Sequence, residues 1–455
     1  MLTTDTLLRV LRENPRAGST ALCRLLGGVN RSTLARGFRL LGSQLVSRGA
    51  ARRARYALRR TLRGSEAPLP LYRIDEQGRG HQVGQLDLTH PAGSALDCTE
   101  PFAWPLIDAM RDGWFDGLPY PLVDMRPQGF LGRNFAHVHA SDLAVSDDPD
   151  AWTDDDIAHV LSTLGDDQPG NLILGETAYR CFLESRRTGG QRILTDAQVA
   201  SAYPELAAAA LAQGVSGSSA GGEFPKFTTS RSLDGAKVDV IVKFSGAEDS
   251  AAVRRWADLL VCEHLALKTL GRELAVPAAQ SAILRHAGRT FLEVVRFDRH
   301  GEFGRSAVCT LGSINAALVG SGPASWPRSA QALSEAGWLP ADDVSRIALV
   351  WWFGKLIGNT DMHDGNLAFR PGLALAPAYD MLPMLYAPLR GGELPDRRYA
   401  PVLPLPEESR LWREAAQAAV SYWQTCSEDT RISPDFRHVC AGNAAELTAA
   451  RRSFS

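Results

Sequence analysis

The sequence predicts a mixed α/β fold in two lobes, preceded by a small helical module of opposite charge. The first reason is length: 455 residues with 45% hydrophobic composition are typical of a folded chain of more than one domain. The second is charge, because residues 1–64 hold 14 arginines, no lysine and two acidic residues, whereas the rest of the chain is net acidic. The third is the alternation of strand-like and helix-like patterns between residues 214 and 380.

Composition excludes several classes of protein. No run of 18 apolar residues occurs, so we expect no membrane span and no membrane partner. The first residues read as a charged amphipathic helix without the apolar stretch of a secretory signal. Seven cysteines show no CxxC pair and no regular spacing, which disfavours a disulfide scaffold or a zinc ribbon. A cytoplasmic protein with reduced thiols is therefore the expectation.

Residues 1–64 carry the pattern of three short helices and a hairpin. Apolar spacing predicts a first helix that ends near Asn14, a second over 20–26, and a third that begins at Asn30 or Ser32. A basic hairpin follows over 45–58. This order is typical of a winged helix-turn-helix domain, whose third helix enters the major groove of DNA.

DNA is accordingly the expected partner of residues 1–64, with a homodimer expected if the operator is two-fold symmetric. Small polar side chains and arginines suit contacts with bases and phosphates. The alternative is a helical protein-interaction domain with a solvated basic face. The candidate DNA-binding residues are Ser32, Thr33, Arg36, Arg48, Arg52 and Arg53.

A glycine- and serine-rich run spans residues 214–222 and could present backbone N–H groups to phosphate. It is not a Walker A loop, because Glu223 follows Gly222 in place of Lys-Ser/Thr. Most glycine-rich loops are plain turns, so the residues that follow decide its interpretation.

A β-branched strand is expected over 238–244, with Lys243 near its end, and a helix over 254–270 that carries Glu263. Glycine-rich loop, strand lysine and helix glutamate occur in this order in the first lobe of protein kinases, where the lysine holds phosphate oxygens and the glutamate fixes the lysine. Taken alone, Glu263 reads as a surface charge. A buried strand over 291–299 comes next, where a hinge between lobes is expected, with its backbone available to the edge of an adenine.

The strongest pattern follows an apolar helix expected over 347–357. Asp361 and Asn366 stand in the D-x-x-x-x-N spacing of a kinase catalytic loop, and Asp380 ends what reads as another apolar strand. Asn and Asp oxygens suit Mg²⁺. Each residue alone could be a turn former, but the set in this order favours phosphoryl transfer. His363 has no second His or Cys at ligand spacing, so we expect it to order the loop or contact nucleotide.

These motifs resemble the HipA family of bacterial toxin kinases, over roughly residues 70–440. An N-terminal winged helix on the same chain resembles one subgroup of that family. The resemblance is carried by Ser218-Ser219-Ala220-Gly221 with Lys226, Arg296-Phe297-Asp298-Arg299, Gly358-Asn359-Thr360-Asp361-x-His363-x-x-Asn366 and Tyr379-Asp380.

The resemblance implies an ATP- and Mg²⁺-dependent serine/threonine protein kinase. Asp361 would be the proton acceptor, and Asn366 and Asp380 would hold Mg²⁺. Ser218 would be autophosphorylated, with Ser219 and Ser216 as alternates, and its phosphate would oppose nucleotide binding by charge. The implied ATP-binding residues are Ala220, Gly221, Gly222, Lys226, Lys243, Val295, Arg296, Phe297, His363, Asn366, Tyr379 and Asp380.

The expected architecture is therefore a two-lobed, protein-kinase-like α/β (α+β) fold of the HipA type. We expect a winged helix-turn-helix over 1–64, the first lobe over 65–295 and a helical lobe over 296–455. A protein substrate and an antitoxin protein are the expected further partners. Two alternatives stay open: a transcription regulator whose kinase fold senses nucleotide, and a small-molecule phosphotransferase.

Overall fold

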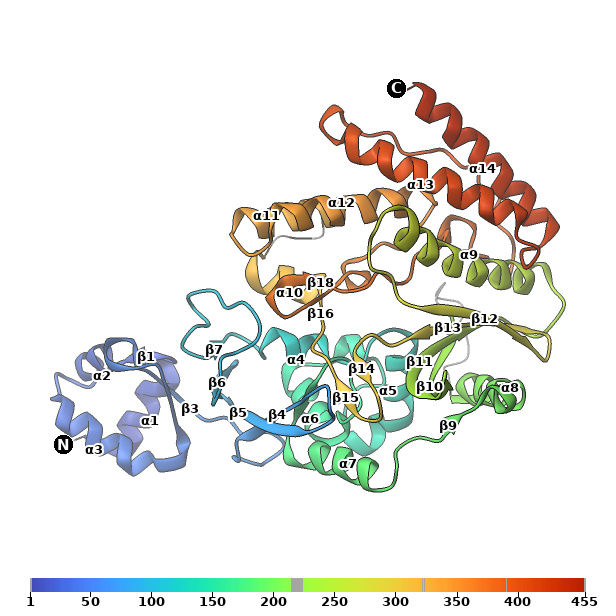
Figure 1. The fold of residues 1–455 in the computed structure, drawn as a ribbon. Coiled ribbons are helices and arrows are strands. Elements are labelled where there is room, and N and C mark those ends of the chain that lie inside the picture. The colour runs from blue at the N-terminus through green and yellow to red at the C-terminus, as the bar shows by residue number, and fades with distance from the viewer. Residues whose placement is uncertain (1, 214–223, 321, 323, 390, 454–455) are drawn as a thin grey trace. The chain divides into compact units, whose positions relative to one another are not determined.

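The structure is a computed structural model with helices and strands throughout (Figure 1). It describes residues 2–213, 224–320, 322, 324–389 and 391–453. Contacts divide the chain into unit 1, which comprises Met1–Asp75, Arg79–Arg126 and Ala151–Thr188, and unit 2, which comprises Glu76–Gly78, Pro127–Asp150 and Gly189–Ser455. Residues 65–295, expected as one lobe, are thus shared between the two units.

The N-terminal module of unit 1 (residues 2–64) has the three helices and the hairpin that the sequence predicts. Asn30 caps the third helix by accepting the backbone N–H of Thr33, and Leu7, Leu11 and Leu34 form the centre of its core. The elements are α1 (Thr4–Glu13), β1 (Ala17–Gly18), α2 (Ser19–Leu25), α3 (Arg31–Leu41), β2 (Leu45–Arg48) and β3 (Arg55–Leu58), with the sheet in the order β1-β3-β2.

The rest of unit 1 is a five-stranded antiparallel sheet with helices α6 and α7 packed near its β8 edge. Thr153 and Asp156 form a reciprocal cap at the start of α6, which fixes where that helix begins. The elements are β4 (Leu69–Ile74), β5 (Gly80–Leu88), β6 (Ser94–Cys98), β7 (Trp114–Phe115), α4 (Tyr120–Asp124), α6 (Asp154–Leu164), β8 (Leu172–Leu174) and α7 (Glu176–Arg187), with the strands in the order β7-β6-β5-β4-β8.

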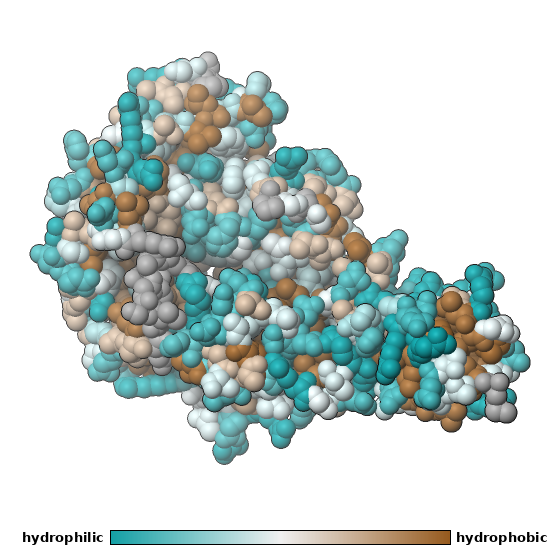
Figure 2. Space-filling view, turned by 180° about the vertical axis from the view of Figure 1, so that it is seen from behind, coloured by the Kyte–Doolittle hydropathy of each residue, from teal (hydrophilic) through white to brown (hydrophobic). Residues whose placement is uncertain are grey.

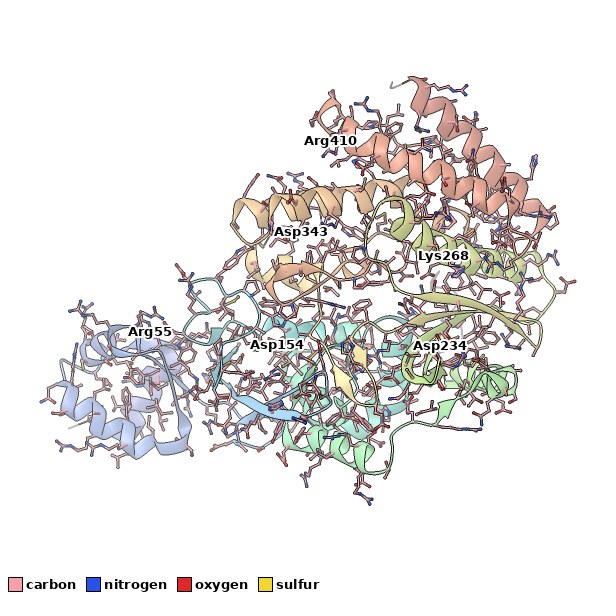
Figure 3. All side chains as sticks on the ribbon, in the orientation of Figure 1. Arg55, Asp154, Asp234, Lys268, Asp343 and Arg410 are labelled. Carbon is pink, nitrogen blue, oxygen red and sulfur yellow. The ribbon has the colours of Figure 1, made fainter. Side chains whose placement is uncertain are left out.

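Unit 2 contains a second five-stranded sheet, in the order β12-β13-β11-β10-β9. Asp234 and Gly235, both with positive φ, form the tight turn between two of its strands, and Figure 3 labels Asp234 there. Phe227, Phe244 and Phe291 pack with Tyr203 in the core. The elements are α5 (Gly129–Leu143), β9 (Ile193–Leu194), α8 (Asp196–Gln213), β10 (Lys226–Leu233), β11 (Ala236–Phe244), α9 (Ala251–Glu273), β12 (Ser281–His286) and β13 (Arg289–Val295).

The remainder of unit 2 is mainly helical, and α13 packs against α9, α12 and α14. Its helices are α10 (Leu311–Leu318), α11 (Trp326–Glu335), α12 (Ala341–Leu356), α13 (Ser409–Glu428) and α14 (Pro434–Ser453). Its short strands are β14 (Arg299–His300), β15 (Gly304–Arg305), β16 (Cys309–Thr310), β17 (Ala368–Arg370) and β18 (Ala374–Leu375).

Two expected strands are shorter than the sequence pattern indicates. The strand expected over 291–299 ends at Val295, because the chain then turns around the buried Asp298 carboxylate. The strand expected to end at Asp380 is wrong: only Ala374–Leu375 is a strand, followed by an isolated bridge between Ala378 and Ala278. Pro377 has no N–H group, so it interrupts the ladder.

In the part of the chain that the structure describes, none of the helices combines the length and the apolar character needed to cross a bilayer.

Candidate active site

Unit 2 brings together a lysine and two carboxylates from three separate elements. Lys243, on β11, donates to both carboxylate oxygens of Glu263, on α9, at 2.8 Å each. The same ammonium also pairs with Asp380. Glu263 and Lys243 are almost fully buried, whereas the side chain of Asp380 is 30% exposed. The arrangement is a buried, fixed pair with a third, more open carboxylate beside it.

The opposite charges in this cluster stabilise each other's charged forms. Burial raises the pKa of Glu263 despite the opposing effect of Lys243. Burial opposes the charged form of Lys243, but the carboxylates of Asp380 and Glu263 outweigh it and raise its pKa. Burial likewise disfavours a charged Asp380, yet the nearby ammonium of Lys243 lowers its pKa below the usual value. Lys243 and Asp380 are therefore held charged at neutral pH.

The loop after α12 is built on the side chain of Asn359, which is 2% exposed. Its amide group donates to the backbone oxygen of Asp380 at 3.2 Å, and its oxygen accepts the backbone N–H of Asp361 at 3.0 Å. Asp380 has a positive φ of 58°, which costs of the order of 1–3 kcal/mol in a residue with a side chain. Asn359 thus ties the Asp361 loop directly to the strained backbone at Asp380.

Asn366 lies in the one-turn 3-10 helix Asp364–Asn366 that closes this loop. Its amide group donates to the backbone oxygen of Asp361 at 2.8 Å, which leaves the side-chain oxygen as the atom for a cation. The Asp380 carboxylate is the second hard oxygen donor. Two such donors fit Mg²⁺, which usually fills its remaining positions with waters and with the phosphate oxygens of a nucleotide. Asp361 itself is exposed, which is compatible with the predicted role of a base that meets a substrate hydroxyl.

His363 and Tyr379 order the same loop from both sides. Nδ1 of His363 accepts the backbone N–H of Gly365 at 3.1 Å, and the hydroxyl of Tyr379 donates to the oxygen of Gly365 at 2.6 Å. The ring of Phe297 lies 5.9 Å from that of Tyr379. The indole N–H of Trp326, on α11, donates to the oxygen of His363. Loop ordering is thus a visible contribution of His363, while a nucleotide contact stays a prediction.

Backbone N–H groups of the expected hinge, residues 295–297, make hydrogen bonds that the sequence did not indicate. The N–H of Val295 donates to Gln280, and the N–H of Arg296 donates to Asp239, so neither is open to an adenine. The guanidinium of Arg296 pairs with buried Asp298 at 3.0 Å, and Arg299 pairs with the same carboxylate. Arg296 and Arg299 therefore shape the turn around Asp298. The adenine contact predicted for residues 295–297 remains a prediction, for groups other than the N–H groups of Val295 and Arg296.

The glycine- and serine-rich run is not placed. Ser216, Ser218, Ser219, Ala220, Gly221 and Gly222 lie outside the described residues. Lys226 is described: it begins β10 directly opposite Lys243 on β11, and its charge lowers the pKa of Asp380. The predicted loop lysine therefore lies on the strand beside the cluster of Lys243, Glu263 and Asp380.

Sequence reasoning missed a second buried network in this unit. Arg231, on β10, pairs with Glu293 and Asp196, and Tyr203 of α8 donates to Glu293. Arg231 and Glu293 are each 3% exposed. The network joins α8 to the sheet immediately before the glycine- and serine-rich run. The sequence held one signal for this network: Arg231 occupies a strand position whose side chain points toward the buried face of the sheet.

The candidate DNA-binding residues fall into two groups. Ser32, Thr33 and Arg36 lie on α3, whereas Arg48 and Arg53 pair with acidic residues elsewhere in unit 1. Arg52 is exposed at the hairpin tip. Figure 2 shows hydrophilic surface over much of the N-terminal module, at the right of that view, with an apolar patch among it. Exposed Leu25 and Leu40 belong to its helices α2 and α3.

Comparison with known proteins identifies the family. Residues 65–183 match a family model described as the YjjJ-like toxin middle domain, and residues 218–440 match the HipA-like C-terminal domain. The chain is 37% identical to "Toxin YjjJ" of Escherichia coli (strain K12) over 409 residues, which cover 87% of this chain and 89% of that protein.

A solved structure agrees at the level of fold. HipA of Shewanella oneidensis MR-1, in a complex with HipB and its operator DNA, matches 85% of this chain and 97% of its own with a TM-score of 0.50 and 14% identity. The Helicobacter pylori proinflammatory kinase CtkA covers 49% of this chain and 90% of its own with a TM-score of 0.33 and 10% identity, too low to bear on the argument. With its middle and C-terminal parts both matched, the chain belongs to the family of YjjJ-like toxins with a HipA-like domain.

Proposed function

We propose that the chain is an ATP- and Mg²⁺-dependent kinase that phosphorylates serine or threonine in a protein. The observation that carries the proposal is the cluster of Lys243, Glu263 and Asp380, tied through Asn359 to the loop of Asp361. A lysine held by a buried glutamate beside an open aspartate is the arrangement with which kinases bind nucleotide phosphates.

Each side chain has a role in this proposal. Lys243 binds phosphate oxygens, while Glu263 keeps its ammonium in place. Asp380 and the side-chain oxygen of Asn366 would hold Mg²⁺, which supplies charge neutralisation when bound. Asp361 accepts the proton of the substrate hydroxyl. The hydroxyl oxygen then forms a bond to the terminal phosphorus as the bond to the leaving diphosphate breaks, and ADP departs.

The proposal extends to regulation and partners. The family resemblance supports autophosphorylation at Ser218, with Ser219 and Ser216 as alternates, as the step that shuts the kinase down. The Shewanella relative is in a complex with HipB and operator DNA, which supports a toxin–antitoxin setting, and residues 2–64 are proposed to bind DNA in this chain.

ATP consumption in the presence of Mg²⁺ tests the chemistry. Asp361→Asn keeps the size of the side chain and removes the base, so turnover should fall by about 10²-fold or more while ATP binding is retained. Asp364→Asn, in the same loop, is the matched control and should stay near wild type. Equal turnover in the wild type and Asp361→Asn would overturn the assignment of the base.

A further inference from the structure

The hairpin β2–β3 of the N-terminal module packs on the antiparallel sheet of the same unit. Val46 of β2 and Ala57 of β3 are buried against Ala95 of β6 and Trp114 of β7. The backbone joins as well: the N–H of Arg60 donates to Leu88, and the N–H of His90 donates to Leu58, each at 2.8 Å. One face of the hairpin is therefore part of the core of unit 1.

Arginines that could reach phosphate are used in this contact. Asp87, with a side chain 5% exposed, pairs with Arg48 at 2.7 Å and with Arg59 at 2.8 Å. Arg53 pairs with Asp112, and Arg16 with Asp116.

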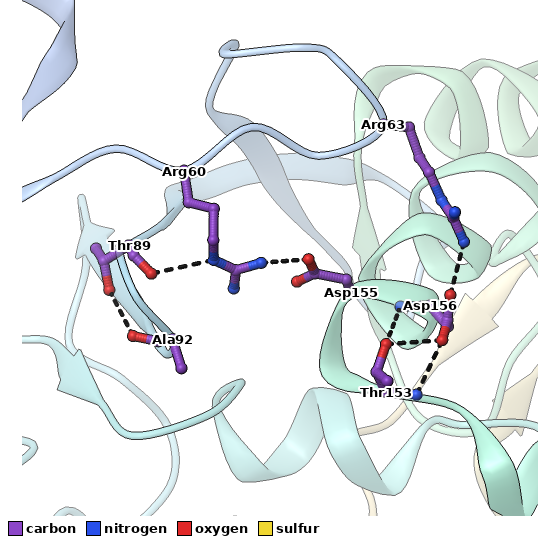
Figure 4. Close-up of polar contacts among 7 residues, drawn as sticks. All are labelled: Arg60, Arg63, Thr89, Ala92, Thr153, Asp155 and Asp156. Atoms are coloured by element: carbon purple, nitrogen blue, oxygen red, sulfur yellow. Dashed lines mark hydrogen bonds and ion pairs between the residues drawn. The ribbon is translucent and has the colours of Figure 1, made fainter.

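Figure 4 shows the pairs at the end of the module, Arg60 with Asp155 and Arg63 with Asp156, both at the start of α6. Arg60 also donates to the backbone oxygen of Thr89. Six of the 14 arginines in residues 1–64 are thus paired with carboxylates that lie between residues 87 and 156.

Helix α3 is different. Arg31, Ser32, Arg36 and Arg39 are all exposed. Within the described residues neither Arg31 nor Arg36 has an ion pair. The N-terminal end of the helix, capped by Asn30, carries no acidic residue in its first turn. This face keeps the charge and the open surface that a phosphate backbone requires.

We propose that the hairpin β2–β3 is a docking element for the β7-β6-β5-β4-β8 sheet of unit 1, and that the duplex is contacted through α3 and not through Arg48 or Arg53. The inference rests on the proposed DNA binding by residues 2–64 and specifies which surface performs it. Along the hairpin, the carboxylates of Asp87 and Asp112 take the place of phosphates, and the contact fixes the hairpin within unit 1.

The test is the salt dependence of duplex binding by the full chain, measured by anisotropy of a fluorescent duplex of arbitrary sequence. Each phosphate contact contributes about −0.9 to the slope of log K against log salt. Arg36→Ala should reduce the slope by about one, whereas Arg53→Ala should leave it unchanged. Both side chains are exposed enough for the variants to fold.

The outcomes separate the inference from the proposed function. An equal loss of slope in Arg53→Ala and Arg36→Ala would overturn the docking assignment and leave DNA binding intact. Absence of duplex binding by the wild type would overturn both. Hydrogen exchange without DNA checks the docking itself: Asp87→Asn should speed exchange at residues 45–58 by roughly tenfold or more, while Asp116→Asn, whose carboxylate is exposed, should not. Unchanged exchange in Asp87→Asn would contradict the docking.

Discussion

Lys243 pairs with two carboxylates that differ in burial, and the difference assigns them different roles. Glu263 is 1% exposed and pairs with Lys243 at 2.8 Å, so we expect it to keep hold of the ammonium when nucleotide binds. Asp380 is more open and also accepts from Asn359 through its backbone. We expect nucleotide and metal to draw the Asp380 carboxylate from Lys243 while Glu263 remains in place.

Glu263→Gln tests this division of roles. The neutral amide would hold Lys243 less firmly, so the ammonium would stay paired with Asp380. The Asp380 carboxylate would then not be free to bind a cation. We expect turnover to fall by about 10²-fold, the cost of misplacing a reacting group by about 1 Å. Glu273→Gln, at the end of the same helix, is the control. Steady-state ATP turnover measures both, and wild-type activity in Glu263→Gln would contradict the role.

Asp258, on α9, gives a pH dependence of stability that is independent of catalysis. It accepts the backbone N–H and the hydroxyl of Ser433, just before α14. Burial raises its pKa to about 6, despite these hydrogen bonds. The folded chain therefore binds this proton more tightly than the unfolded chain, and the contribution of Asp258 to the free energy of unfolding falls as pH rises from about 4 to about 6.

Asp258→Asn removes this titration and can keep both hydrogen bonds, because an amide offers one acceptor and one donor. Relative to wild type, the free energy of unfolding of the variant should rise by about 2–3 kcal/mol between pH 4 and pH 7. Urea unfolding at the two pH values measures the difference, in which other titrating groups cancel. The same difference at both pH values would contradict the assignment.

At the scale of elements, the loop between α12 and Asp380 holds several of the candidate site residues in one hydrogen-bonded structure. Helix α12 ends at Leu356, Gly358 takes a positive φ of 73°, and Asn359 then reaches across to the Asp380 backbone. Tyr379 closes the loop from the other side through Gly365. The geometry of the Asp361 loop is thus set by Asn359 and Tyr379.

Asn359→Ala removes two buried hydrogen bonds from this loop. We expect a loss of stability of about 1–3 kcal/mol and a fall in kcat with little change in KM for ATP, because Lys243 and Glu263 are untouched. Thermal unfolding and steady-state kinetics report the two effects separately. A rise in KM with unchanged kcat would show that Asn359 serves binding and not the placement of the base.

The sequence predicted the elements of this site better than their junctions. Apolar periodicity reports local structure, and it placed the bounds of α9 and β11 within about three residues. Helix α12 begins at Ala341, before the start expected at Ile347, because its first residues are largely polar. Spacing also paired Asp361 with Asn366. It could not show that Asp380 contacts Lys243, since the two residues are 137 positions apart and meet only through packing. Pro377 was visible in the sequence and should have ended the expected strand.

At the scale of the molecule, residues 1–64 are less separable than their charge indicates. The charge step at residue 64 predicts a cationic module joined to an acidic remainder, and arginines of the module pair with Asp87, Asp155 and Asp156 of the same unit. Charge composition describes a segment by itself, whereas pairing depends on where the chain places the opposite charges. The acidic balance of the remaining chain was the only hint.

Deletion of residues 1–64 tests this at the whole-chain level. We expect the truncated chain to keep the proposed ATP turnover, because the cluster of Lys243, Glu263 and Asp380 lies in unit 2. We also expect unit 1 to unfold at a lower temperature, since Ala95, Trp114 and Asp87 lose their cover. Thermal unfolding followed by tryptophan fluorescence, with turnover measured in parallel, checks both. A soluble truncated chain with unchanged unfolding would contradict the docking of the hairpin.

The measurement that tests the central claim most directly is phosphosite mapping after incubation of the full chain with γ-labelled ATP and Mg²⁺. The wild type and Asp364→Asn should carry label on a serine between residues 214 and 223, and Asp361→Asn should carry none. Nucleotide binding without label on the chain or on any added protein would contradict a protein kinase. It would favour a nucleotide sensor or a small-molecule phosphotransferase.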